Sequence, residues 1–125
     1  MSIRRSGKII TLEGLDKSGK RVQTRLLVDA LRKEGFQVET IAFPNYSTPI
    51  GREIKAFLYG RRRYPIEVRH MLLALNRWER KDLLEQWLSE GKIIVLDRYC
   101  QSNLAYGLAR GLDRDWILNL EYGLP

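Results

Sequence analysis

Short apolar runs occur at intervals along the chain, and longer segments of mixed character separate them. Residues 9–12 and 93–96 are almost continuously apolar and partly β-branched, and residues 38–43 form a looser run. Runs of this length are too short for helices and predict strands. Continuous apolar character is typical of strands that are buried on both faces of a sheet.

The longer segments carry apolar residues at every third or fourth position, which predicts helices that each bury one face. The first helix stops at Gly35, the second runs from Pro49 to Gly60, and the third runs from Pro65 to about Glu90 with one break allowed. Strands that alternate with helices indicate an α/β fold, in which a parallel sheet is covered by helices on both faces.

The composition narrows the class of protein. The chain has 125 residues, which suits one domain (1–125) with one core, and 44% of them are hydrophobic, which excludes an intrinsically disordered chain. Cys100 is the single cysteine, so an intrachain disulfide is excluded. We expect a cytoplasmic protein without a membrane segment, because no apolar stretch has the length of a membrane helix or the flanks of a signal peptide.

The chain is basic, with 22 Lys and Arg against 15 Asp and Glu, a net charge of +7. This charge is compatible with nucleic acid, an anionic membrane or a polyphosphate ligand, and it does not choose among them. The run 61–63 consists of three arginines between two predicted helices. We expect it in a solvated loop, because runs of like charge usually face water.

A glycine-rich loop follows the first predicted strand. Gly14-x-x-x-x-Gly19-Lys20 matches the phosphate-binding P-loop pattern between a buried strand and a helix. Glycines let the backbone wrap around a phosphate, and free N–H groups and the helix dipole attract the anion. We expect Lys20 to reach the terminal phosphates. The predicted phosphate-binding residues are Gly14, Leu15, Asp16, Lys17, Ser18, Gly19, Lys20 and Arg21.

Arg21 departs from that pattern, because it stands where a Ser or Thr hydroxyl normally binds Mg²⁺ and a guanidinium has no acceptor atom. Asp97, at the end of the third strand, becomes the leading carboxylate for the ion and would hold it through water. The carboxyl ends of parallel strands share one edge of a sheet, and ligands bind in the crevice outside that edge. We therefore expect Lys20 and Asp97 to lie at the same crevice. Alternatively, nucleotide binding persists while phosphoryl transfer is weakened.

Four motifs occur in order along the chain. They are residues 12–20, Phe43-Pro44 with residues 47–51, residues 76–79, and Asp97-Arg98-Tyr99 with Ser102 and Tyr106. In this order and spacing, essentially the whole chain resembles the thymidylate kinase family. The resemblance implies an enzyme that transfers the γ-phosphoryl of ATP to dTMP on the route to dTTP, with Mg²⁺ as cofactor and a homodimer as the assembly.

The same resemblance implies a P-loop fold with five parallel strands, of which three are present here. The remaining strands and the lid would then lie beyond residue 125, and the first strand would form an open edge of the sheet.

Carried over to this chain, the family's catalytic positions are Lys17, Lys20, Asp97 and Arg98. Lys17 stands at the basic P-loop position from which some members stabilise the transferring phosphoryl, whereas others supply arginines from a lid. Asp16 corresponds to a residue near the nucleotide sugar and phosphate.

For dTMP, the resemblance implies that Phe43 and Pro44 form a wall, that Arg77 faces the base, and that Arg98 grips the phosphate as a bidentate donor. The other positions of this site are Asp16, Leu73, Ser102 and Tyr106. Two residues depart from the family pattern: Leu73 replaces a Phe that stacks on thymine, and Tyr46 replaces an arginine that contacts phosphate.

Other interpretations of these residues stay open. Arg77 and Arg98 could serve ion pairs, and Trp78, Leu73 and His70 could serve packing. The competing function is a nucleotide-binding homologue without efficient transfer. Nucleic-acid binding is a minor third hypothesis, because substrate phosphates already account for much of the positive charge.

Overall fold

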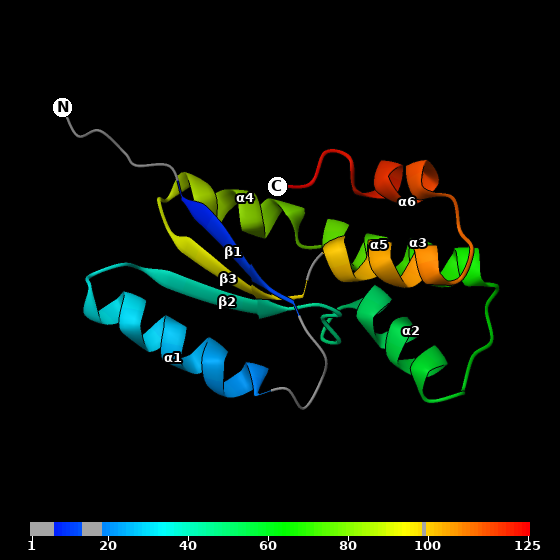
Figure 1. Ribbon diagram of the computed structural model, residues 1–125, viewed down its shortest axis with the longest axis horizontal. Coiled ribbons are helices and arrows are strands. Elements are labelled where there is room, and N and C mark those ends of the chain that lie inside the picture. Colours follow the sequence, from blue (N-terminus) through cyan, green and yellow to red (C-terminus); the bar gives the residue numbers. More distant parts are fainter. Residues whose placement is uncertain (1–6, 14–18, 99) are drawn as a thin grey trace.

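A computed structural model describes residues 7–13, 19–98 and 100–125. Three strands, β1 (Lys8–Leu12), β2 (Val38–Ala42) and β3 (Ile93–Asp97), form one parallel sheet in the order β1-β3-β2 (Figure 1). The register aligns Leu12 and Ala42 with Asp97, so the three carboxyl ends lie side by side. The parallel sheet is confirmed, and β1 is an edge strand among the described strands, as expected.

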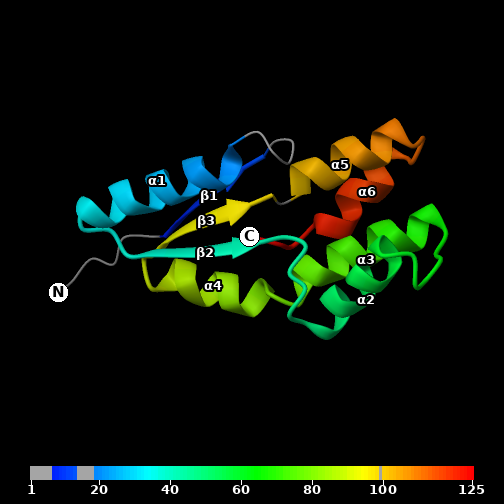
Figure 2. The ribbon, with the colours of Figure 1, turned by 90° about the horizontal axis from the view of Figure 1, so that it is seen from below.

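The central strand β3 supplies the core on both faces of the sheet. Ile94 and Leu96 are fully buried against Leu84 of α4 (Lys81–Ser89), while Val95 packs with Val28 of α1 (Lys20–Lys33). Alternate residues of a strand point to opposite faces, which is why a continuous apolar run is needed here. Helices α1 and α4 therefore cover opposite faces of the sheet (Figure 2), as the sequence predicted.

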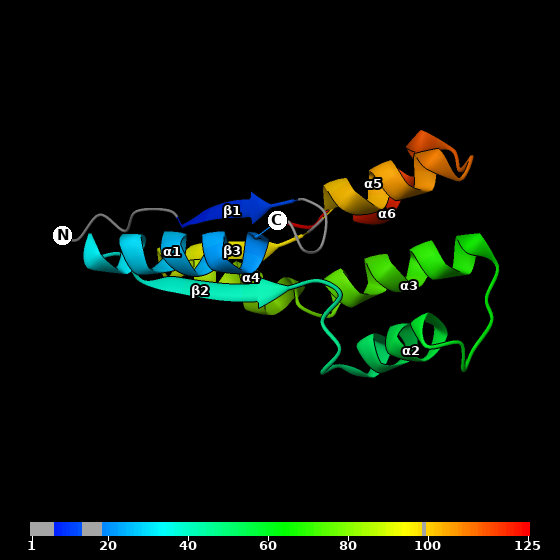
Figure 3. The same cartoon turned by 60° about the horizontal axis from the view of Figure 1, so that its bottom comes forward.

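The other four helices lie beyond the carboxyl ends of the strands (Figure 3). They are α2 (Pro49–Leu58), α3 (Ile66–Trp78), α5 (Cys100–Ala109) and α6 (Arg114–Glu121). Helix α3 packs against each of the other three. The long helix predicted over 65–90 is broken at residues 79–80, between α3 and α4.

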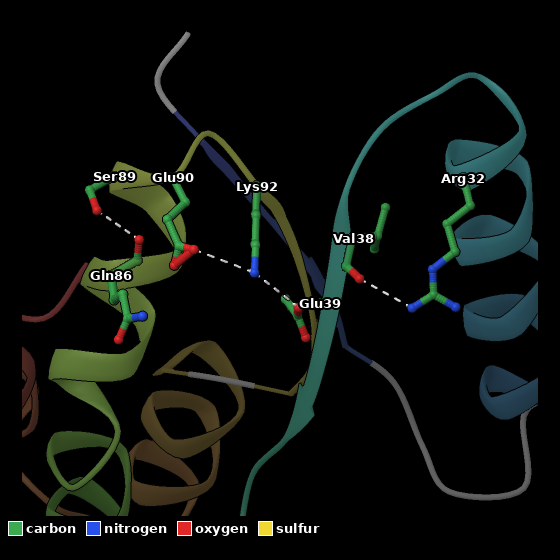
Figure 4. Close-up of polar contacts among 7 residues, drawn as sticks. All are labelled: Arg32, Val38, Glu39, Gln86, Ser89, Glu90 and Lys92. Atoms are coloured by element: carbon green, nitrogen blue, oxygen red, sulfur yellow. Dashed lines mark hydrogen bonds and ion pairs between the residues drawn. The ribbon is translucent and has the colours of Figure 1, made fainter. Parts of the chain in front are cut away.

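At the opposite end of the sheet, polar contacts join strands to helices (Figure 4). The Lys92 ammonium lies 3.3 Å from Glu39 Oε1 and 3.6 Å from Glu90 Oε2, and its hydrogen bond to Glu39 raises the pKa of Lys92. Arg32 of α1 donates to the carbonyl oxygen of Val38 at 3.1 Å. These partly buried contacts tie the amino ends of β2 and β3 to each other and to their flanking helices.

No helix within the described residues is long and apolar enough to cross a membrane.

Candidate functional site

A cavity of about 1080 Å³ opens beyond the carboxyl ends of the strands. Its wall combines the ends of β2 and β3, the loop after β2, the connection from α2 to α3, and parts of α1, α2, α3 and α5. This is the edge of a parallel sheet at which ligands generally bind. The cavity is thus built by segments that are distant in sequence.

Asp97 and Arg98 lie where the three strand ends meet. The Arg98 amide donates to Leu12 O at 2.9 Å, and the Phe43 amide donates to Asp97 O at 3.0 Å, so backbone bonds join all three ends. Arg98 has a φ of 65°, which is uncommon and strained for a residue with a side chain. Asp97 and Arg98 both line the cavity.

The loop after β2 forms one wall, and Asn76 of α3 holds it in place. The Asn76 side chain accepts from the Asn45 amide at 2.6 Å and donates to Asn45 O at 2.9 Å, so it pairs with both backbone groups of that residue. Asn76 is fully buried. This pairing fixes the segment that carries Phe43 and Pro44, which are joined by a cis peptide bond.

The start of α2 is fixed by the same part of α3. Thr48 caps α2 by accepting from the Gly51 amide at 2.9 Å, and its hydroxyl donates to Glu79 Oε1 at 2.6 Å. A side chain at Gly51 would place a Cβ 2.8 Å from Tyr46 Cα and closer still to Asn45 O. The motif residues Thr48, Gly51, Asn76 and Glu79 therefore shape the wall of the cavity.

Arg77 is held by a buried ion pair with α6. Its Nε donates to Glu121 Oε2 at 2.9 Å and its Nη2 donates to Glu121 Oε1, while the side chains of Arg77 and Glu121 are only 4% and 9% exposed. Beside them, Trp78 Nε1 donates to Leu120 O at 2.7 Å. Arg77 nevertheless lines the cavity, so the ion-pair and site interpretations of this residue are compatible.

His70 and Tyr106 face each other between α3 and α5, with ring centres 6.2 Å apart. His70 is fully buried and lines the cavity together with Tyr106. A Cβ at Gly107 would lie 2.4 Å from Ile117 Cδ1 of α6 and 3.2 Å from His70 Cε1, so the glycine makes room for both side chains against α5. His70 therefore packs at the α3–α5 interface, as the sequence suggested.

Positive charge dominates the cavity. Asp97 is the single carboxylate among the described lining residues, against seven arginines: Arg21, Arg62, Arg63, Arg69, Arg77, Arg98 and Arg110. Such a surround attracts anions and suits planar recognition of phosphate oxygens. The chemistry favoured by this cavity is the binding of a phosphorylated ligand.

Comparison with known proteins identifies the family. The family model described as thymidylate kinase matches residues 12–125. The chain belongs to the thymidylate kinase family. Thymidylate kinase from Schizosaccharomyces pombe is 38% identical over all of this chain and 60% of that protein. The Homo sapiens thymidylate kinase is also 38% identical, over 97% of this chain and 58% of that protein.

A solved structure has the same fold. The structure of thymidylate kinase from Candida albicans superposes with a TM-score of 0.82 at 33% identity and covers all of this chain and 60% of that one. The P-loop kinase fold expected from the sequence is thereby confirmed. The chain spans about 60% of the length of these relatives.

The cavity brings together most of the described residues that the family resemblance singled out. Nine predicted site positions line it: Arg21, Phe43, Pro44, Tyr46, Leu73, Arg77, Asp97, Arg98 and Tyr106. Gly19 adopts a left-handed conformation, with a φ of 81°, directly before α1. This conformation is one that glycine adopts without strain.

Several predicted residues lie outside the described part of the chain. These are Gly14, Leu15, Asp16, Lys17 and Ser18, together with the side chains of Lys20 and Ser102. Their roles in a thymidylate kinase site stay predictions.

Four arginines that line the cavity were not predicted as site residues: Arg62, Arg63, Arg69 and Arg110. Arg62 and Arg63 are solvent-exposed, as expected of that loop, yet they also border the cavity, and Arg62 Nε lies 3.1 Å from Glu53 Oε1. A signal for Arg69 existed, because Arg69, Leu73 and Arg77 follow one another at four-residue spacing and so share a helix face.

The described residues contain no group of three His, Cys, Asp or Glu side chains that could hold a metal ion. Among the described residues that line the cavity, Asp97 is the single carboxylate. Mg²⁺ keeps several waters and takes one or two carboxylates plus phosphates, so a single carboxylate fits it.

Proposed function

We propose that the protein transfers the γ-phosphoryl of ATP to dTMP, giving dTDP and ADP, on the route to dTTP. The observation that carries the proposal is that Phe43, Arg77, Arg98 and Tyr106 line one cavity, at the sheet edge that bears Asp97. A mouth surrounded by guanidinium groups matches a phosphomonoester substrate, and the aromatic wall matches a base.

Phosphoryl transfer depends on alignment and charge neutralisation rather than on covalent chemistry by the protein. In the proposed site, Arg98 holds the dTMP phosphate and Arg77 faces the base. The backbone hydrogen bond from Arg98 to Leu12 and the ion pair of Arg77 with Glu121 keep both residues in place before substrate arrives. Preorganised donors of this kind lower the barrier because they need not reorient during the reaction.

The other parts of the proposal concern residues near ATP. Lys17 and Lys20 would neutralise the ATP phosphates, with Lys17 supplying charge at the transferring group. When bound, Mg²⁺ neutralises and orients the ATP phosphates, and Asp97 would hold it through water. Arg21, which lines the cavity, adds a permanent charge in place of a metal-binding hydroxyl.

A coupled assay of ADP release with ATP, dTMP and MgCl₂ tests the proposal. We expect turnover that requires dTMP, is abolished by EDTA and falls at least about 100-fold in Arg98→Ala, because a charge-assisted bidentate contact is lost. Arg52→Ala, at an exposed position of α2, is the matched control and should retain activity. Absence of dTMP-dependent turnover in a folded sample would reject transfer.

The competing proposal is a homologue that binds nucleotide without efficient transfer, and Arg21 is the residue that favours it. Calorimetry distinguishes the two, since this alternative requires dTMP binding without turnover.

We further propose one domain over residues 1–125, a homodimer and a cytoplasmic location. Light scattering checks the assembly, and a fluorescent fusion checks the location.

The similar Candida albicans structure is described as revealing the origin of broad substrate specificity. Leu73 makes base preference worth measuring in this chain too, with dTMP, dUMP and dGMP compared side by side.

A further inference from the structure

The buried pair of Arg77 and Glu121 stands at the wall of the cavity, and only one member of the pair borders it. Arg77 lines the cavity, whereas Glu121 is not among the described residues that do. The Glu121 carboxylate accepts from Arg77 Nε at 2.9 Å and also from Nη2, and both side chains are almost fully buried. Any effect of Glu121 on a ligand in the cavity therefore passes through Arg77.

Contacts on both sides of Glu121 fix its place in the fold. Trp78 Nε1 of α3 donates to the carbonyl oxygen of Leu120, the residue directly before Glu121, at 2.7 Å. Leu124, three residues after Glu121, packs against the core cluster that contains Leu84 of α4. The backbone that carries the carboxylate is thus anchored to α3 and to the core before any ligand binds.

The pairing changes what Arg77 recognises. An arginine binds phosphate and carboxylate groups best through two parallel N–H groups. Glu121 takes one such edge of Arg77, formed by Nε and Nη2, and its negative charge balances the guanidinium. A guanidinium in this state suits a neutral ligand atom that accepts a hydrogen bond, because its N–H groups donate and cannot accept. A base carbonyl is such an acceptor, whereas an exocyclic amino group is itself a donor.

We propose that Glu121 is a positioning residue that makes Arg77 select the base. By taking the bidentate edge and balancing the charge, Glu121 turns Arg77 from a phosphate-binding group into a donor to a base carbonyl. The ligand class is a pyrimidine nucleotide with an oxo group, as in thymine and uracil, where cytosine carries its amino group. This inference rests on the proposed function, because it takes the base to lie at Arg77.

Calorimetry on the full chain with dUMP and dCMP tests the inference. These nucleotides share the sugar, the phosphate and the lack of a ring methyl group, and they differ only at the base edge that carries the oxo or amino group. We expect dUMP to bind at least about tenfold tighter than dCMP, since one hydrogen bond to a charged group contributes about that factor. In Glu121→Gln, which keeps the shape and removes the charge, the two affinities should lie within about threefold of each other.

Asp113→Ala is the matched control, because it weakens α6 without touching the pair. Asp113 caps the other end of α6 by accepting from the Trp116 amide at 2.9 Å, so its loss should lower the melting temperature and leave the ratio of the two affinities unchanged. A role of Glu121 in stability alone predicts the same behaviour in Glu121→Gln. If Glu121→Gln does not fold, the double variant with Arg77→Gln, which buries no unpaired charge, should fold and lose the preference for dUMP.

Equal affinity of the unmodified chain for dUMP and dCMP overturns the inference. A preference for dUMP that survives in Glu121→Gln or in the double variant overturns it as well. Both results leave the proposed function intact, because they do not concern the binding of dTMP. Failure of dTMP to bind to the unmodified chain overturns the proposed function instead.

Discussion

Arg77 of α3 and Glu121 of α6 form a buried pair across 44 positions of sequence. The carboxylate takes the Nε edge of the guanidinium, and the same arginine borders the cavity. Glu121 is therefore in a position to orient a residue that we propose to face the substrate base.

Removing one partner of this pair should be costly, because it leaves a buried charge without compensation. We expect Glu121→Ala to lower the free energy of unfolding by about 3–5 kcal/mol, and Glu121→Gln to lower it less. Urea unfolding measures both. Glu85→Ala, in the exposed pair of Lys81 and Glu85 at 3.4 Å, is the control and should change stability by less than about 1 kcal/mol. Equal effects at Glu121 and Glu85 would show that the buried pair adds nothing.

Asn76 should be essential to the wall of the cavity. Asn76→Ala leaves the amide and carbonyl of Asn45 without their side-chain partner, so we expect a loss of about 2 kcal/mol or more in urea unfolding. Affinity for dTMP should fall as well, because the Phe43-Pro44 segment loses its anchor. Ser47→Ala, on the exposed part of the same loop, is the control. A variant with reduced stability but unchanged dTMP affinity would separate Asn76 from the site.

The left-handed backbone of Arg98 predicts an unusual order of stabilities. Arg98→Gly should be about 1 kcal/mol more stable than Arg98→Ala, since glycine adopts a φ of 65° without strain. Both variants should lose dTMP binding. Arg52 has the helical conformation of α2, so the order should reverse there: Arg52→Ala should be about 1 kcal/mol more stable to unfolding than Arg52→Gly. The same order at both positions would mean that the Arg98 backbone is unstrained.

Leu73 offers a gain-of-affinity test. It lines the cavity, so Leu73→Phe adds an aromatic surface for the base, and we expect dTMP to bind about fivefold to 100-fold tighter. Leu72→Phe, at the neighbouring position of α3 that does not line the cavity, should bring no gain. Calorimetry measures the affinity, and a melting curve shows whether the larger side chain is tolerated. Unchanged affinity in a folded Leu73→Phe would place the base elsewhere.

Local pattern was sufficient for the strands, for α1 and α2, and for the helical character of residues 65–90, in which one break was allowed but not located. It also brought Asp97 and Arg98 to the ligand edge of the sheet, because a parallel strand that ends in polar residues must present them there. The spacing of apolar residues and the positions at which strands end depend on residues that are close in sequence. Both can therefore be predicted without knowing how the chain packs.

Helices α5 and α6, the pairing of Glu121 with Arg77, and the position of Arg110 at the cavity did not follow from local pattern. Helix α5 has a weak apolar stripe, and Arg77 finds its carboxylate only because α6 packs on α3. The sequence shows that a residue is an arginine, but it does not show whether the side chain faces water, a carboxylate or a ligand. Packing between distant segments decides among these, and that packing is a property of the folded chain alone.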